Sequence, residues 1–168
     1  MQRDAEKEGT HKQGTGKGEE GRGEAGERPS LTLTRHFKAP PELVYQAWTD
    51  PRKIVHWFGP DAGPVLSAEA DVCVGGRYRV VLRTLDGEEH DVSGLYREVV
   101  PNRRLVFSWT WRTMPERTSL VTVTMQAQEG GTLFTLNHAQ FFDEKARDDH
   151  NRGWNGCLDK LGGFLIAA

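Results

Sequence analysis

The side chain best placed for chemistry is His138, the last residue of the segment Thr135–His138. Alternation along a strand puts it on the same face as Phe134 and Leu136, toward the interior. An imidazole with an ordinary pKa of about 6.5 could orient a polar group of a ligand there, or act as an acid and base. The simpler interpretation, which we favour, is a core histidine that is hydrogen-bonded to the long C-terminal helix.

Two further reactive side chain types lie in that C-terminal helix. His150 precedes Trp154 by one helical turn; it could meet His138 across a cavity mouth, but a position on the helix surface is the expected one. Cys157 lies beside Trp154, and buried cysteines usually behave as small hydrophobic residues rather than as reactive thiols. Cys73 falls at a strand end and has the same interpretation, and two cysteines cannot form a disulfide scaffold.

Motifs for metal binding and nucleophilic catalysis are missing from the sequence. It contains no HExxH pair, no paired CxxC, no aspartate-rich calcium loop and no GxSxG elbow. We therefore expect no metal ion, no cofactor and no assigned catalytic residue. Two GxGxxG matches within residues 16–26 lack the strand and helix that a phosphate loop needs. The direction of Glu98 is open, because Gly94 could mark a bulge that changes strand parity.

The spacing of apolar residues predicts the elements that hold these side chains. A helix over Glu42–Thr49 has Leu43 and Ala47 inward, with Val44 and Trp48 as further candidates for that face. It precedes a second helix from Asp50 to about Trp57, and a long helix covers about 143–166. Because the helices are separate from the run of strands, the fold class is α+β, an antiparallel sheet with its helices on one face. The predicted strands are 31–37, 66–73, 77–83, 90–99, 105–111, 121–125 and 132–139.

Composition divides the chain near residue 29. Residues 1–29 hold seven of the 19 glycines, and their apolar side chains are Met1, Ala5 and Ala25. We expect a disordered tail there and one domain over residues 30–168. A net charge of −2 gives no basic surface for nucleic acid. No apolar run approaches the roughly 18 residues of a membrane span, and the N-terminus lacks the apolar core of a signal peptide, so a cytoplasmic location is expected.

Aromatic residues gather on the inward faces of the predicted strands and on the long helix. Five tryptophans are a mild enrichment for a chain of this length. Indole N–H and phenol O–H groups need partners when buried, so these residues suit an apolar cavity with a few polar tips. The candidate ligand-binding residues are Trp57, Phe58, Tyr78, Val80, Leu82, Phe107, Trp109, Trp111, Val123, Met125, Phe134, Leu136, His138, Trp154 and Leu158.

Four segments in order resemble one known family. They are APPELVYQAWTDPRKIVHWFGP (39–60), VGGRYRVVLRTLDGEEHDVSGLYREVVPNRRLVFSWTW (74–111), GGTLFTLNHAQF (130–141) and HNRGWNGCLDKL (150–161). The sequence resembles the START-like, or SRPBCC, superfamily, in the branch named after the activator of a heat-shock chaperone's ATPase. The resemblance implies a helix-grip fold, in which a curved antiparallel sheet of about seven strands surrounds a long C-terminal helix and an apolar cavity.

Three functions follow from the residues and the resemblance together. The leading hypothesis is non-catalytic binding of a small hydrophobic molecule in the cavity. The second is a cavity enzyme of the cyclase, hydrolase or isomerase type, with His138 as its acid and base. The third is a protein-interaction module that contacts a chaperone, as the family name implies, with a role in the stress response. A homodimer is open as well, since small domains often pair.

Overall fold

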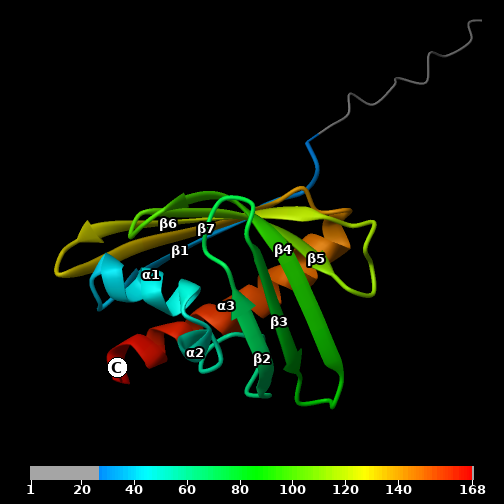
Figure 1. The fold of residues 1–168 in the computed structure, drawn as a ribbon, viewed down its shortest axis with the longest axis horizontal. Coiled ribbons are helices and arrows are strands. Elements are labelled where there is room, and N and C mark those ends of the chain that lie inside the picture. Colours follow the sequence, from blue (N-terminus) through cyan, green and yellow to red (C-terminus); the bar gives the residue numbers. More distant parts are fainter. Residues whose placement is uncertain (1–26, 168) are drawn as a thin grey trace, which may run out of the picture.

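The computed structural model describes residues 27–167, so most of the predicted tail lies outside the described residues. Seven antiparallel strands form one sheet in the order β1-β7-β6-β5-β4-β3-β2. Apart from the pair of β1 with β7, neighbouring strands in the sheet are neighbours in sequence, so β2 to β7 form a meander (Figure 1). The strands are β1 Leu31–Phe37, β2 Val65–Ala70, β3 Arg77–Arg83, β4 Glu89–Val100, β5 Arg104–Trp111, β6 Ser119–Gln128 and β7 Gly131–Ala139.

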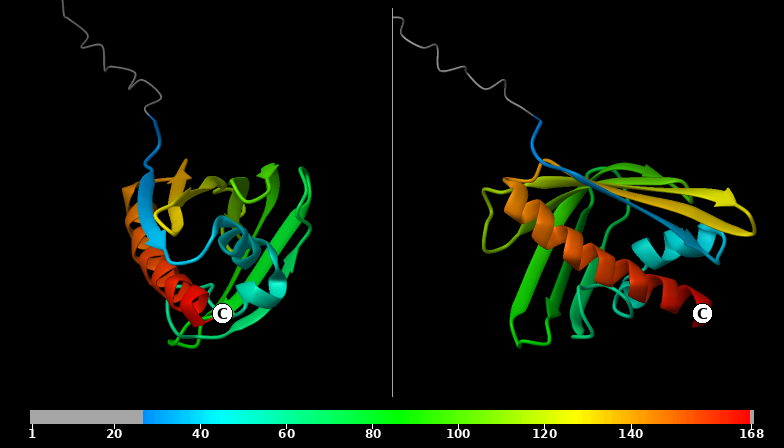
Figure 2. Two further views of the ribbon diagram at one scale, coloured as in Figure 1. Left: turned by 90° about the vertical axis from the view of Figure 1, so that its left-hand side faces the viewer. Right: turned by 180° about the vertical axis from the view of Figure 1, so that it is seen from behind.

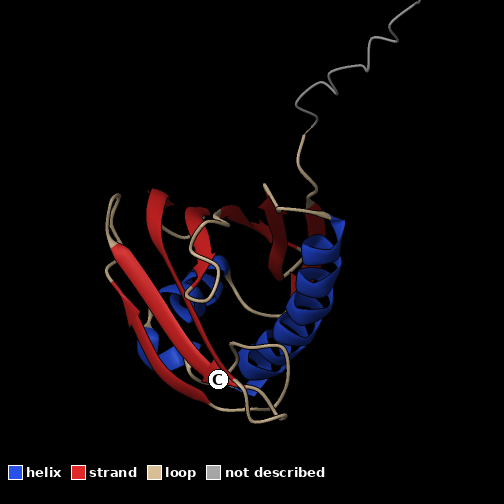
Figure 3. Ribbon diagram, turned by 90° about the vertical axis from the view of Figure 1, so that its right-hand side faces the viewer, coloured by secondary structure: helices blue, strands red, loops and turns tan. Residues whose placement is uncertain are grey.

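The long helix α3 (Glu144–Ala167) lies along the concave side of the curved sheet, as Figures 2 and 3 show. The Asp143 carboxylate accepts a hydrogen bond from the Ala146 backbone N–H at 2.8 Å, which caps the first turn. The α+β class predicted from strand parity and the helical stripe is confirmed, and so is the helix-grip fold that the family resemblance implies. None of the helices in the described part of the chain is both long and apolar enough to span a bilayer.

The two short helices are α1 (Pro41–Thr49) and α2 (Pro51–Ile54), which contact β6 and β2 respectively. The predicted inward position of Leu43 is wrong. The inward position of Ala47 is confirmed, and the further candidates Val44 and Trp48 complete the buried stripe at helical spacing. The second helix also ends at Ile54, earlier than expected, and the chain continues as turns to Phe58.

Strand β4 contains the bulge that the sequence left open. Its register with β5 shifts between Tyr96 and Glu98. Tyr96 stays buried, while the Glu98 carboxylate accepts a hydrogen bond from Arg104 Nε at 3.1 Å on the outer face. Gly94 is needed next to this bulge, because a Cβ there would lie 1.9 Å from the Ser108 carbonyl oxygen. Strand β2 also ends early, at Ala70, because the chain turns between residues 71 and 76.

Buried aromatic and aliphatic side chains fill the space where α1 and α3 meet strands β1, β7 and β6. The Trp48 ring stacks on Phe134 with centroids 5.6 Å apart and lies 5.9 Å from Trp154. Phe134, Leu136 and Leu161 have no exposed surface at all. This half of the sheet anchors the helix, and a cavity lies at the other half, between α3 and strands β3, β4 and β5.

Candidate functional site

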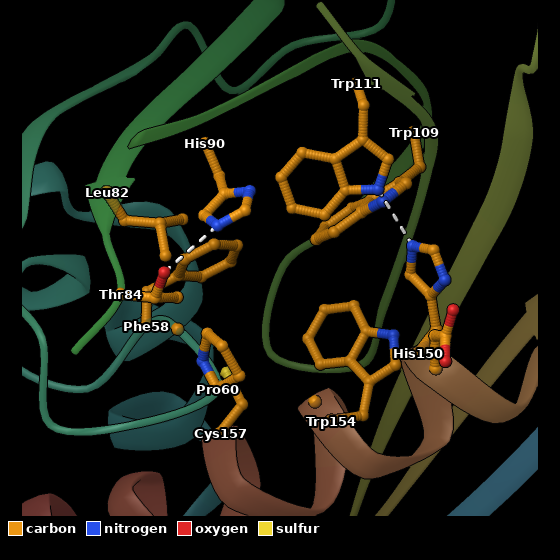
Figure 4. Close-up of a pocket in the computed structure, with 13 residues that line it drawn as sticks. Phe58, Pro60, Leu82, Thr84, His90, Trp109, Trp111, His150, Trp154 and Cys157 are labelled. Atoms are coloured by element: carbon orange, nitrogen blue, oxygen red, sulfur yellow. Dashed lines mark hydrogen bonds between the residues drawn. The ribbon is translucent and has the colours of Figure 1, made fainter. Parts of the chain in front are cut away.

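A cavity of about 200 Å³ lies between α3 and strands β3, β4 and β5. We call it the aromatic cavity. In Figure 4, Leu82, His90 and Phe58 lie on one side of it, and Trp111, Trp109 and Trp154 lie on the other. The lining residues are Phe58, Gly59, Pro60, Leu82, Thr84, His90, Trp109, Trp111, Asp149, His150, Gly153, Trp154 and Cys157.

The side chains that line the sheet side of the aromatic cavity are positioned by regular strand geometry. Trp109 and Trp111 are two residues apart on β5 and share its inner face. Leu82 on β3 pairs with His90 on β4, so both reach the same region of the sheet. The polar members, Thr84 and His90, are hydrogen-bonded to one another at 3.1 Å. The sheet wall is thus apolar, with one polar pair at the β3–β4 hairpin.

The loop after α2 lines the cavity beside the β3–β4 hairpin and is tied to α3. The Lys160 ammonium donates hydrogen bonds to the backbone carbonyls of Phe58, at 3.3 Å, and Asp61, at 2.5 Å. Burial lowers the pKa of Lys160. Gly156 lets the loop approach, because a Cβ on it would lie 2.2 Å from the Pro60 carbonyl oxygen. These contacts fix how far the helix stands from the sheet.

His138 is the centre of a hydrogen-bonded chain in the interior. The Trp154 indole N–H donates to His138 Nδ1 at 3.0 Å, so that nitrogen must be the acceptor. His138 Nε2 therefore carries the hydrogen and donates to Ser119 Oγ at 2.7 Å. Ser119 in turn contacts the Trp109 carbonyl oxygen at 3.4 Å. His138 is fully buried, and burial, with the nearby His150, lowers its pKa, so the ring is neutral. This is the core histidine bonded to the long helix that the sequence favoured.

His150 lies beside this network, and its expected position on the helix surface is wrong. Its Nε2 accepts the Trp111 indole N–H at 2.9 Å, and its Nδ1 donates to the Ala146 carbonyl at 2.7 Å. Its ring centroid is 5.2 Å from that of His138. Burial lowers the pKa of His150 too. The cause of the inward position is Trp111, which reaches the helix from β5.

A second cavity of about 180 Å³ adjoins the first, and we call it the polar cavity. Four residues line both cavities: Trp109, Trp111, Asp149 and His150. The Trp111–His150 hydrogen bond therefore belongs to the partition between them. The other lining residues of the polar cavity are Arg28, Met114, Arg117, Thr118, Ser119, Gln140, Phe141, Phe142, Asp143, Lys145 and Ala146.

Two further places in the described part of the chain carry reactive groups, namely Cys157 on α3 and a cluster at the β3–β4 hairpin. Burial raises the pKa of the Cys157 thiol to about 12, so it is protonated at neutral pH. Asp86, Glu88 and His90 place ligand atoms within 4.8 Å of one another at the β3–β4 hairpin. The Asp86 carboxylate there accepts hydrogen bonds from Thr84 Oγ1 and the Glu88 N–H, so it already serves the turn.

The structure brings some of the predicted ligand-binding residues together and leaves others apart. Phe58, Leu82, Trp109, Trp111 and Trp154 line the aromatic cavity. A cavity of about 30 Å³ behind it is lined by a second group, which includes Trp57, Tyr78, Val80 and Phe107. The residues that line neither of these two spaces are Val123, Met125, Phe134, Leu136, His138 and Leu158.

Sequence reasoning missed several residues of the aromatic cavity. Thr84 continues the inward parity of Leu82 one step past the end of β3, and the β3–β4 hairpin brings His90 opposite Leu82. Both signals were present in the sequence. Gly153 and Cys157 carry no such signal, because their place in the wall depends on how α3 lies against the loop after α2.

The curved sheet around a long helix, with an aromatic cavity between them, defines a START-like helix-grip domain. Residues 38–165 match the family described as "Activator of Hsp90 ATPase homolog 1-like protein", AHSA1. The chain belongs to this family.

Solved structures agree with this assignment. A Silicibacter pomeroyi protein described as AHSA1 is 26% identical, with a TM-score of 0.73 over 83% of this chain and 99% of the other. A Chromobacterium violaceum protein is 26% identical, with a TM-score of 0.74 over 81% and 96%. CalU16 from Micromonospora echinospora is 29% identical, with a TM-score of 0.61 over 81% and 75%. No curated protein sequence matches the chain.

Proposed function

We propose that this protein binds a small hydrophobic molecule in the aromatic cavity and does so without chemical change. The observation that carries the proposal is the lining of that cavity, in which Trp109, Trp111, Trp154, Phe58 and Leu82 surround one space between sheet and helix. Concave, mostly apolar sites with a few polar groups are typical of small-molecule binding.

The size of the cavity restricts the ligand. An engineered apolar cavity of about 150 Å³ in another protein holds benzene. A cavity of about 200 Å³ therefore suits a one-ring or two-ring molecule. Thr84 and His90 add polar atoms to the otherwise apolar sheet wall of that space.

The states of the two buried histidines favour binding over catalysis. A general base needs a free lone pair within reach of the substrate proton. The acceptor nitrogens of His138 and His150 are already occupied by the indole N–H groups of Trp154 and Trp111. The cytoplasmic location, the homodimer and the chaperone contact stay predictions.

A titration with 2-ethylnaphthalene tests the proposal. We expect the indole N–H signals of Trp111 and Trp154 to shift in ¹H–¹⁵N NMR spectra as the probe fills the cavity. Gly153→Leu is designed to fill the cavity with a side chain and so block binding. Gly153 lines the cavity, and a Cβ there meets only ordinary contact, with Pro60 at 3.6 Å.

Gly163→Leu is the matched control, since it makes the same change on the same helix where a Cβ meets nothing within 4 Å. We expect Gly153→Leu to weaken binding by about tenfold or more, whereas Gly163→Leu binds as the wild type does. Equal binding by both variants, or no binding by the wild type, would contradict the proposal.

A further inference from the structure

One buried donor in the wall of the two cavities has no hydrogen-bond partner. Trp109 is only 4% exposed, and no acceptor for its indole N–H lies within reach among the described residues. Leaving a buried donor unpaired is unfavourable, so a native unpaired group needs an explanation. Trp48 carries another such N–H, but it lines neither the aromatic nor the polar cavity.

The unpaired N–H lies beside the partition between the cavities. Trp109 lines both of them, and its ring is edge-on to that of Trp111, with centroids 5.4 Å apart. In Figure 4 the indole nitrogens of Trp109 and Trp111 lie on the same side of their rings, toward His150. A ligand acceptor that displaced the His150 imidazole from Trp111 would therefore meet two indole donors.

The polar cavity, beyond this partition, carries cationic side chains. Arg28, Arg117 and Lys145 line it together with Asp143 and Asp149. Both carboxylates are already engaged. Asp143 caps α3, and Asp149 accepts a hydrogen bond from Lys145 at 2.7 Å and another from Arg152. Arg117 lies over the Phe142 ring, 3.9 Å from its centroid, with Glu116 3.9 Å away.

We infer that the two cavities form one site for an elongated amphipathic acid, and that the indole N–H groups of Trp109 and Trp111, together with Arg117, determine its preference for a carboxylate. The apolar body fills the aromatic cavity. The carboxylate lies at the partition, where it accepts the N–H groups of Trp109 and Trp111 and faces Arg117. The inference rests on the proposed function, because it needs the aromatic cavity to be occupied.

Three probes of matched shape separate the two claims. They are 2-ethylnaphthalene, 3-(2-naphthyl)propanoate and the primary amide of that acid. The hydrocarbon tests the aromatic cavity alone, and the amide adds length and acceptor without charge. We expect the acid to bind about tenfold more tightly than the amide, because hydrogen bonds to charged groups are the stronger ones.

Two variants remove the groups that would hold the carboxylate. Trp109→Phe keeps an aromatic ring and removes the unpaired N–H, and Arg117→Gln removes the cation. Each should reduce the advantage of acid over amide to about threefold or less, while the affinity for 2-ethylnaphthalene changes little in Arg117→Gln. Arg97→Gln, on the exposed side of the β4 bulge, is the control and should keep the full advantage.

The outcomes separate this inference from the proposed function. If all three probes bind wild-type protein equally, the proposed function stands and the amphipathic acid is wrong. If none of them binds, both are wrong. An acid preference that survives both Trp109→Phe and Arg117→Gln would place the carboxylate elsewhere and overturn the inference. A preference lost in both variants and kept in Arg97→Gln supports it.

Discussion

The two halves of the interface between sheet and helix are built differently. At β1, β7 and β6 the sheet presents Phe134 and Leu136, and the C-terminal part of α3 adds Leu161 and Leu165, all of them buried. At β3, β4 and β5 the sheet presents large aromatic side chains, but α3 presents Gly153 and Cys157 beside Trp154.

The difference shows how one helix can both stabilise a fold and leave room for a ligand. Protein interiors are close-packed, so a space of about 200 Å³ has to be kept open by the residues around it. The space stays open because small residues face it from the helix and because the hydrogen bonds of Lys160 hold the loop after α2 in place. We call the part at β1, β7 and β6 the packed half. Its rigid packing keeps α3 in position, and the cavity at β3, β4 and β5 therefore stays open.

Truncating a leucine in each half should have the largest and most contrasting effect. Leu161→Ala is expected to lower the free energy of unfolding by about 2–5 kcal/mol, because it opens a new cavity in the packed half. Leu82→Ala should cost about half as much, because Leu82 already borders the aromatic cavity and has fewer contacts to lose. Urea denaturation measures both. Equal losses would mean that the two halves are packed alike.

Substitutions at two glycines of α3 test whether the contact with the loop after α2 sets the distance between the helix and the sheet. Gly156→Ala should destabilise the protein by about 1–3 kcal/mol, because its Cβ would meet the Pro60 carbonyl. Gly163→Ala, with open space around it, should instead stabilise by up to about 1 kcal/mol through its helix propensity. Thermal melts of the two variants give the signs. Stabilisation by Gly156→Ala would show that the loop moves away freely.

The buried histidines predict how stability depends on pH. Burial lowers the pKa of both His138 and His150 in the folded state, so the unfolded chain takes up protons first as the pH falls below about 6.5. Their contribution is complete above that pH and is lost on acidification toward the lowered folded-state pKa values. Each histidine contributes a slope of at most about 1.4 kcal/mol per pH unit.

Denaturation at a series of pH values from 7 to 5 checks this. His138→Gln and His150→Gln should each flatten the slope relative to that of the wild-type protein. A slope that neither inner variant alters would mean that the two imidazoles accept protons inside the fold, against the hydrogen-bond directions set by Trp154 and Trp111.

The elements of the fold could be predicted from the sequence because their signals are local, whereas the helix-grip arrangement was implied by the resemblance to the family. Alternation set the strands, and the stripe of Trp154, Leu158, Leu161 and Leu165 set the buried face of α3. The parity of β7 likewise placed His138 in the core. These patterns depend on residues two to four positions apart, and each agrees with its neighbours in specifying the same fold.

The site was predicted only in part because its shape depends on contacts between residues far apart in the chain. Lys160 meets the Phe58 carbonyl, Gly156 meets Pro60, and Trp111 meets His150. No periodicity in the sequence indicates these pairs. The inward direction of His150 was therefore missed, and residues such as Leu136 and Val123 were grouped with the cavity although they lie in the packed half.

The most direct test of the central claim is a crystal structure of the protein soaked with 2-bromonaphthalene, in which the anomalous signal locates the bromine atom. We expect one strong peak in the aromatic cavity, with the ring system between Leu82 and Trp154, and no peak in the packed half. Gly153→Leu crystals soaked in the same way should lack it. A wild-type structure without a peak there, with side chains collapsed into the space between β3–β5 and α3, would contradict the account.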